Sequence, residues 1–376
     1  DAKSVAGEPR QIGEPEGLPG GRPFKGKKQT GRRREPGQGP GKGRKAQGNQ
    51  GTAQEGKAHR PPAFHSAERS GRRPTWRSRM RRLSAFSTRK RSRPTVVVDY
   101  VTVSSSELMR AVVEDDAAFD LAVSSALDLE TKLANDGYTR AHSPAGRLRI
   151  PDWAVWRDHV FAFSQEPASI VLSPAAFEGL EMPRSRQALM SLLRRYPNRF
   201  RGRIGTYEVE TSGLGYLFAT QDLRTSESFW RMMEIFGSLD LRLYCCSGEM
   251  IEAVARGELA IAYNVLGSYA RARVDLADRI EIVDPQDYTN MMLRTAVVLR
   301  GAERPDLAGA FIDHLLRAAW GNQRDPAYPF PRYATAETSP TAALRPIQMG
   351  PGLLVFLDRL KRARFLEEWR STVLQK

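Results

Sequence analysis

Short apolar runs alternate with helix-forming segments from residue 95 to the end of the chain. Runs typical of buried strands lie at residues 95–103, 119–124, 204–207, 241–245, 259–263, 280–283 and 295–299. Between them apolar residues recur at helical spacing, as in Phe229, Met232, Met233 and Phe236. Strands that alternate with helices over about 280 residues predict an α/β fold with mostly parallel sheets.

Three of the predicted strand-to-helix junctions are rich in Ser and Gly. They lie at residues 124–126, 211–214 and 247–249, and the second belongs to the stretch RIGTYEVETSGLGYLF at residues 203–218. The first N–H groups of a helix have no partner within the helix, and the helix dipole adds partial positive charge there. Such junctions can hold an anion, and in parallel sheets they converge beyond the strand ends. We therefore expect a ligand site at residues 203–218, although an ordinary strand–helix turn is the alternative.

The positive charge of the chain lies in its first quarter. Net charge is +15 over 376 residues, yet residues 1–94 hold 25 of the 58 Lys and Arg and only 7 of the 43 Asp and Glu. This Gly-, Pro- and Arg-rich segment has too few aliphatic residues to form a core, so we predict that it is disordered. Three interpretations stay open: a basic arm that binds nucleic acid or an anionic surface, an inert tail, or an artefact of translation in a wrong frame.

Few side chains in the sequence point to catalysis. The adjacent Cys245 and Cys246 have no metal-ligand spacing; we expect small strand residues with one or both buried, a disulfide between them being the alternative. Glu166, Asp128 and Glu249 are isolated acids, for which we expect solvated or helix-capping positions. No nucleophile elbow, phosphate-binding loop or zinc motif occurs. The sequence predicts a binding protein and not an enzyme, with no cofactor and no metal.

Several long segments are similar to one family of binding proteins. They are SSALDLETKLANDGY, FRGRIGTYEVETSGLGYLFATQD, YCCSGEMIEAVARGELAIAYNVLGSY, the PQDYT turn before TAVVL, and AGAFIDHLL. With them, residues 95–376 resemble the periplasmic solute-binding proteins of ABC importers that have the type II periplasmic-binding fold, in the branch of ferric-iron and organophosphate binders. Members of this family are not enzymes.

The resemblance implies two α/β lobes that close on a ligand. Lobe one would comprise residues 95–172 and 287–376, and lobe two residues 173–286; the family's first strand and helix have no counterpart here, so lobe one is expected to be incomplete. The implied ligand contacts are Ser124, Ser125, Ala126, Thr211, Ser212, Gly213, Leu214, Tyr263, Asn264 and Tyr288. The implied partners are a small solute and either the permease subunits of an ABC transporter or a membrane sensor. The implied location is the periplasm, although no signal peptide is visible.

The tyrosines decide between the two solute classes of this branch. The family's ferric binders hold iron with two adjacent tyrosines, whereas Tyr263, Tyr269 and Tyr288 are not adjacent. We therefore expect a small anionic organic solute, such as an organophosphate or a phosphonate. Ferric iron is the alternative solute, and nucleic-acid or surface binding through residues 1–94 is the alternative from another class.

Overall fold

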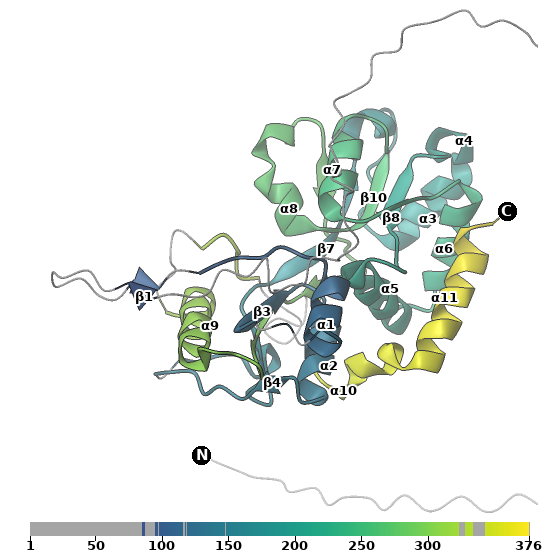
Figure 1. Cartoon of the computed structure of the whole chain (residues 1–376). Coiled ribbons are helices and arrows are strands. Elements are labelled where there is room, and N and C mark those ends of the chain that lie inside the picture. Colours follow the sequence, from purple (N-terminus) through teal and green to yellow (C-terminus); the bar gives the residue numbers. More distant parts are fainter. Residues whose placement is uncertain are drawn as a thin grey trace, which may run out of the picture. The chain divides into compact units, whose positions relative to one another are not determined.

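The computed structural model describes residues 98–115, 117, 119–146, 148–322, 328–333 and 343–375, and the backbone of residues 85–86 and 95–96 (Figure 1). The chain divides into two units, residues 1–70 and 71–376, and all the described residues lie in the second. The three interpretations of residues 1–94 concern residues that lie almost entirely outside the described ones, and they stay open.

A five-stranded sheet is built around strand β13 (Thr295–Leu299). Its other strands are β3 (Leu121–Ser124), β4 (Thr139–Arg140), β5 (Val155–Trp156) and β6 (Val160–Ala162). Strand β13 pairs with β3, β4 and β6, β5 pairs with β6, and every one of these pairs is antiparallel. The expectation of mostly parallel sheets is wrong for this sheet, because β13 is reached only after the chain has passed through a second sheet and runs back in the opposite direction.

The second sheet has seven strands in the order β14-β12-β7-β10-β8-β9, with β11 also paired to β7. Their bounds are β7 (Glu166–Leu172), β8 (Ile204–Tyr207), β9 (Arg242–Tyr244), β10 (Ile261–Leu266), β11 (Glu281–Val283), β12 (Thr289–Met292) and β14 (Leu344–Pro346). Strand β8 lies parallel to both β10 and β9, as predicted, whereas β7 is antiparallel to its three neighbours. Strand β7 is buried over its whole length, since it pairs with β12 at its start and with β10 and β11 further along.

Helices cover both faces of each sheet. Their bounds are α1 (Ser105–Val113), α2 (Leu127–Asn135), α3 (Arg186–Arg195), α4 (Pro197–Phe200), α5 (Gly213–Thr225), α6 (Phe229–Ser238), α7 (Ser247–Ala255), α8 (Gly267–Ala272), α9 (Pro305–Trp320), α10 (Pro351–Leu354) and α11 (Arg359–Val373). In the five-stranded sheet α9 packs on one face and α1 and α2 on the other. In the seven-stranded sheet α3, α6 and α11 share one core, and α7 lies in the core of the opposite face. No helix among the described residues is long and apolar enough to cross a membrane.

The apolar run at residues 95–103 does not form the predicted buried strand. Only Thr95–Val96 (β2) is in a strand, paired with Ala85–Phe86 (β1). Beyond it Val98, Tyr100 and Val101 are 44%, 76% and 38% exposed. A buried strand needs a hydrogen-bonded neighbour and a covered face. Within the described chain residues 98–103 have no strand partner, and the five-stranded sheet ends at β3.

The apolar pattern of residues 353–369 predicts a single amphipathic C-terminal helix, but the structure divides this segment in two. Helix α10 ends at Leu354 and a new helix, α11, begins after Asp358, whose carboxylate accepts hydrogen bonds from the backbone N–H groups of Leu360 and Lys361. Helix α11 lies along α6 (Figure 1), and Trp369 packs in the same core as Phe229. The lobe boundaries stay a prediction. Helix α11 belongs to lobe one in that prediction, but it packs in a core formed mainly by residues 173–286, the predicted lobe two.

Candidate functional site

The N-termini of α1, α2 and α5 meet at Gly213. A Cβ atom added to Gly213 would lie 3.2 Å from the Cβ of Ser105, 3.3 Å from Cδ1 of Leu129 and 3.4 Å from the Cβ of Ala126. A larger side chain at position 213 would therefore push α5 away from α1 and α2. Three sets of helix-terminal N–H groups and three dipole ends are thus directed towards one region.

Hydroxyl groups join the three helix starts. The Ser105 and Ser124 hydroxyls lie 3.0 Å apart, and Ser124 Oγ accepts a hydrogen bond from Ala126 N at 3.0 Å. Ser106 Oγ donates to the carbonyl of Thr211 at 3.4 Å. The structure thus brings together the predicted residues at positions 124–126 and 211–213. Their contact with a solute stays a prediction.

Ser212 begins α5 as its N-cap. Its Oγ accepts a hydrogen bond from Gly215 N at 3.2 Å, and Leu214, the next predicted site residue, packs at the edge of an apolar cluster. Gly215 itself lies so close to Tyr207 that an added Cβ would be 2.3 Å from that residue's Cβ. The cap and the close approach together fix where α5 begins.

The Ser212→Ala substitution is expected to lower the free energy of unfolding by about 1 kcal/mol, because it removes the acceptor for one helix-terminal N–H group. Urea unfolding followed by circular dichroism measures this change. Ser238→Ala, whose hydroxyl only donates to the Ile235 carbonyl at an exposed position, is the matched control and should cost much less. Equal effects of the two substitutions would contradict the capping role.

The other three predicted contacts gather in a different place, around the buried carboxylate of Asp222. Tyr263 Oη donates to it at 2.7 Å and Asn264 Nδ2 at 2.8 Å, while Asn290 Nδ2 donates to its second oxygen at 2.7 Å. The guanidinium carbon of Arg186 lies 3.7 Å from the centre of the Tyr288 ring, over its face. Tyr263 and Asn264 are 1% and 4% exposed, so both face the interior in this structure.

Arg186 completes this network, and its positive charge is almost fully buried. Its Nε donates to Tyr263 Oη at 2.6 Å, and its Nη2 lies 3.5 Å from Asp222. Asp287 accepts from the Arg186 backbone at 3.2 Å and pairs with Nη1 at 3.4 Å. The network joins α3, α5, β10, β12 and the turn before β12, which the sequence does not reveal, since two directly bonded members, Arg186 and Tyr288, lie 102 residues apart.

A second ion pair, also absent from the sequence prediction, lies where β7 begins. Glu166 is fully buried and accepts two hydrogen bonds from Arg294, Nε at 3.0 Å and Nη2 at 3.1 Å. The hydroxyls of Ser164 and Ser268 donate to the same carboxylate at 2.7 and 2.5 Å. Burial opposes the charge of Arg294, but the Glu166 carboxylate more than offsets this and raises the pKa of the guanidinium. The expectation that Glu166 is solvated or caps a helix is wrong, because its partner is 128 residues away.

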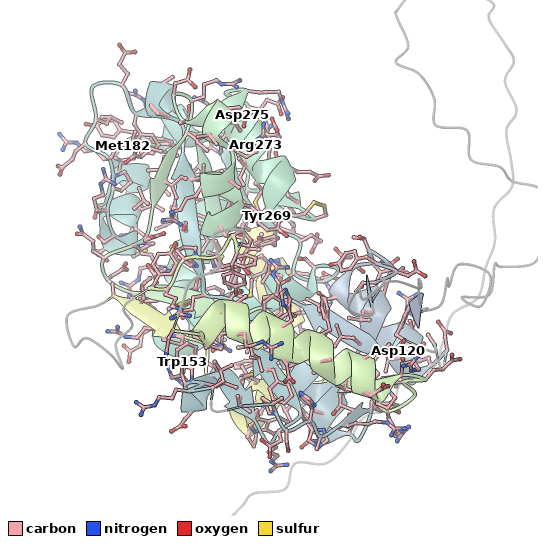
Figure 2. All side chains as sticks on the ribbon, turned by 90° about the vertical axis from the view of Figure 1, so that its left-hand side faces the viewer. Asp120, Trp153, Met182, Tyr269, Arg273 and Asp275 are labelled. Atoms are coloured by element: carbon pink, nitrogen blue, oxygen red, sulfur yellow. A yellow bond between two sulfur atoms is a disulfide. The ribbon has the colours of Figure 1, made fainter. Side chains whose placement is uncertain are left out.

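Arg294 lies close to the serine-rich junction. It immediately precedes Thr295, which pairs with Ser124 across the ladder between β13 and β3. The guanidinium carbon lies 5.9 Å from the ring centre of Tyr269, which is 45% exposed. In Figure 2 Tyr269 lies between α9 and the end of the molecule that carries Arg273 and Asp275. The partly buried guanidinium of Arg294 therefore belongs to the residue next to the strand position that pairs with Ser124.

One solved structure decides the family. The chain is 33% identical to the substrate-binding protein of an ABC transporter from Agrobacterium tumefaciens, with a TM-score of 0.64 over 72% of this chain and 84% of that one. This chain belongs to the substrate-binding proteins of ABC transporters. The resemblance seen in the sequence and the predicted two-lobed α/β fold are confirmed.

Two more distant structures share the fold of this substrate-binding protein. AfuA from Actinobacillus pleuropneumoniae, with fructose-6-phosphate bound, is 14% identical, with a TM-score of 0.54 over 71% of this chain and 86% of that one. Iron-bound HitA from Pseudomonas aeruginosa is 17% identical, with a TM-score of 0.50 over 71% and 87% of the two chains. A scan against protein-family models and a search of curated proteins give no match.

Two buried acids lie in α2 of this substrate-binding protein, directly behind the junction at residues 124–126. Asp128 is 3% exposed, and burial raises its pKa to about 7 although backbone N–H groups of Leu129 and Asp128 favour the charged form. Burial also raises the pKa of Glu130 well above its usual value, opposed by Thr295 and Arg294. The expectation that Asp128 is solvated is wrong, because this part of α2 faces the interior: Leu127, Asp128, Glu130 and Thr131 are all buried.

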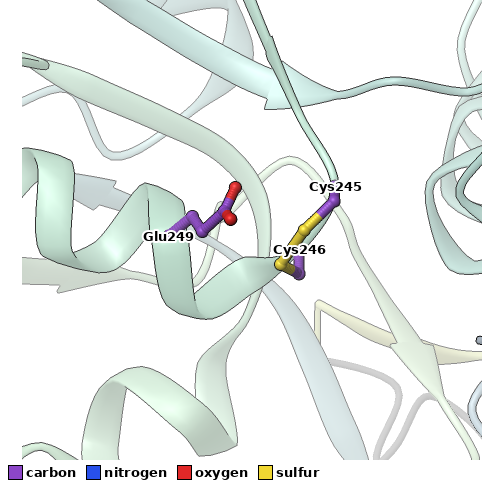
Figure 3. A group of neighbouring side chains, drawn as sticks. All are labelled: Cys245, Cys246 and Glu249. Atoms are coloured by element: carbon purple, nitrogen blue, oxygen red, sulfur yellow. A yellow bond between two sulfur atoms is a disulfide. The ribbon is translucent and has the colours of Figure 1, made fainter. Parts of the chain in front are cut away.

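The two cysteines also differ from the expectation. Strand β9 ends at Tyr244, so Cys245 and Cys246 lie in the turn before α7, where both are exposed and form a disulfide with each other. Glu249 is exposed in the first turn of α7, with its carboxylate beside the two sulfurs (Figure 3). The alternative prediction, a disulfide between neighbours, is the one that the structure contains.

Proposed function

We propose that this protein captures a small anionic organic solute between its two lobes, as the receptor of an ABC import system. The observation that carries the proposal is the meeting of three helix N-termini at Gly213. Each N-terminus favours a nearby negative charge by roughly 0.3–1 kcal/mol, and more when the charge is partly buried. Solute entry requires the contacts around Gly213 to separate, since that glycine has no free space beside it.

The donor set suits phosphate or phosphonate oxygens. Ser124, Ser125 and Ser212 offer hydroxyl and backbone donors, and Arg294, whose neighbour Thr295 pairs with Ser124, supplies positive charge. Arginine forms short, charge-assisted hydrogen bonds with such oxygens. The Glu166 carboxylate already holds two nitrogens of Arg294 in a fixed orientation. The guanidinium is therefore positioned before any solute arrives.

The tyrosines give less support to ferric iron. Tyr263 is bound to Asp222 and Arg186, and Tyr288 lies below the same guanidinium. Of the three tyrosines considered as iron ligands, Tyr263, Tyr269 and Tyr288, only Tyr269 is substantially exposed. Iron would need at least one of the buried phenols to leave its network, so an anionic organic solute is the better proposal.

The family supplies the expected partners and place of action. Because the chain belongs to the substrate-binding proteins of ABC transporters, we infer permease subunits in the membrane as its partners and the periplasm as its location. Release of the captured solute to a permease needs no chemical step, which agrees with a binding protein that is not an enzyme. A membrane sensor built on the same fold would use the same site.

Calorimetry on the full chain tests the proposal, with sugar phosphates, alkyl phosphonates, dicarboxylates and ferric citrate as titrants. We expect binding of at least one phosphate or phosphonate ester, and at least tenfold weaker binding by the Gly213→Val variant because the added side chain occupies the space that the solute needs between the three helix N-termini. Gly248→Val is the matched control: Gly248 also lies in the first turn of a helix but has no atom within 4 Å of an added Cβ. Binding of ferric citrate alone, or equal binding by both variants, would contradict the proposal.

A further inference from the structure

A compact group of three potential metal ligands lies at the start of α7. One atom each from Cys245, Cys246 and Glu249 lies within 4.8 Å of the other two, and all three residues are exposed (Figure 3). The sulfurs are joined in a disulfide. No described residue forms a hydrogen bond or an ion pair with the Glu249 carboxylate. This group has no part in the solute site proposed above.

We propose that reduction of the Cys245–Cys246 disulfide creates a binding site for one Zn²⁺ ion, held by both thiolates and the Glu249 carboxylate. In the oxidised protein the sulfurs carry no negative charge and are bonded to each other, so the site is closed to metal. Its availability therefore depends on the redox state of the surroundings. This inference goes beyond solute capture.

The chemistry of the two steps is simple. A dithiol reductant breaks the S–S bond, supplies two electrons and two protons, and is itself oxidised to a cyclic disulfide. Zn²⁺ then displaces the two thiol protons and forms two Zn–S bonds of about 2.3 Å and one Zn–O bond of about 2.0–2.2 Å. Water occupies the fourth position. Soft thiolate ligands favour Zn²⁺ over the hard cations Mg²⁺ and Ca²⁺.

The surrounding structure favours such a site. Cys246 is the N-cap of α7, so the positive end of the helix dipole faces the negatively charged ligands. The next residue, Ser247, is buried, and its Oγ bonds to Tyr207 Oη at 2.5 Å and accepts from Leu266 N at 3.1 Å. The start of the helix is therefore fixed to β8 and β10. Glu249 is held only two residues further along the same turn.

Metal titration of the full chain before and after reduction tests the inference. The reductant is removed without oxygen, free thiols are counted, and Zn²⁺ is titrated against a colorimetric chelator. We expect one additional Zn²⁺ per reduced chain, and none in the oxidised chain or in the Cys245→Ser/Cys246→Ser variant. Glu249→Gln should weaken this binding about tenfold or more, whereas Glu181→Gln, an exposed acid in a distant loop, should leave it unchanged.

Three outcomes would overturn the inference. The first is equal Zn²⁺ binding by oxidised and reduced protein, and the second is equal binding by reduced wild type and the double serine variant. The third is an affinity of Glu249→Gln that equals that of Glu181→Gln. Far-UV circular dichroism of each variant separates loss of the site from loss of the fold. Because all three ligands are exposed, we expect every variant to fold.

Discussion

Asp222→Ala is expected to lower the free energy of unfolding by about 3–5 kcal/mol, the cost of removing one partner of a buried ion pair. Asp222 is fully buried and accepts hydrogen bonds from Tyr263, Asn264 and Asn290. The substitution leaves these donors without their acceptor, and the one carboxylate that still pairs with Arg186 among the described residues is that of Asp287, whose side chain is 30% exposed. Urea unfolding at pH 7 measures the change.

The control for this result is Asp278→Ala. The Asp278 side chain is 83% exposed and lies 3.9 Å from Arg279, a surface pair of a kind that contributes about 0–1 kcal/mol. Asp222→Asn is a second informative variant, because it keeps the shape of the side chain while removing its charge. If Asp222→Ala cost no more than Asp278→Ala, the network around Arg186 would not be a stabilising one.

The local features of the fold could be predicted because their causes lie within a few residues. Ser212 caps α5 through a hydrogen bond to a residue three positions along, and Gly137 ends α2 with φ of +80°. A Ser before apolar residues at helical spacing carries the first signal, and a Gly directly after such residues carries the second. Strand β8 has the bounds that its apolar run predicts, because every one of its residues is buried.

The long-range features could not be predicted, since they depend on which distant segments meet. Nothing near Glu166 indicates Arg294, and nothing near Asp222 indicates Tyr263. Pairing buries both acids completely, although Glu166 is expected from the sequence to be solvated or to cap a helix. The same reasoning applies to residues 98–103. Their composition predicts a strand, but within the described part of the chain no strand lies beside them to pair with.

The sequence itself points to the serine-rich junction of the candidate site, but not to the buried network around Asp222. Residues 124–126 and 211–213 are recognisable because helix starts with Ser and Gly have a defined electrostatic character. Tyr263 and Tyr288 were inferred by family resemblance, and in this structure both face a buried network rather than the serine-rich junction. Their contact with solute would require β10, which carries Tyr263, and the turn that carries Tyr288 to move relative to Asp222.

Asp128→Asn should make the protein more stable at neutral pH and leave it little changed in acid. The pKa of Asp128 is raised from 3.8 to about 7 by burial. The folded protein therefore keeps a proton that the unfolded chain loses, and the stability contributed by the neutral carboxyl is present below pH 3.8 and is lost as pH rises to about 7. At about 1.4 kcal/mol per pH unit, the full loss is at most about 4.5 kcal/mol.

Urea unfolding of both proteins between pH 5 and pH 8 measures this effect as a difference, so that the contributions of Glu130 and of all other acids cancel. We expect the advantage of Asp128→Asn to grow by roughly 2.5–3 kcal/mol over this range. Asp306→Asn is the control in the first turn of α9: a hydrogen bond from Arg304 lowers the pKa of Asp306, so its substitution should cost a little stability at neutral pH. A difference between Asp128→Asn and wild type that is constant with pH would show that Asp128 is charged in the folded protein, and that the start of α2 is open to water.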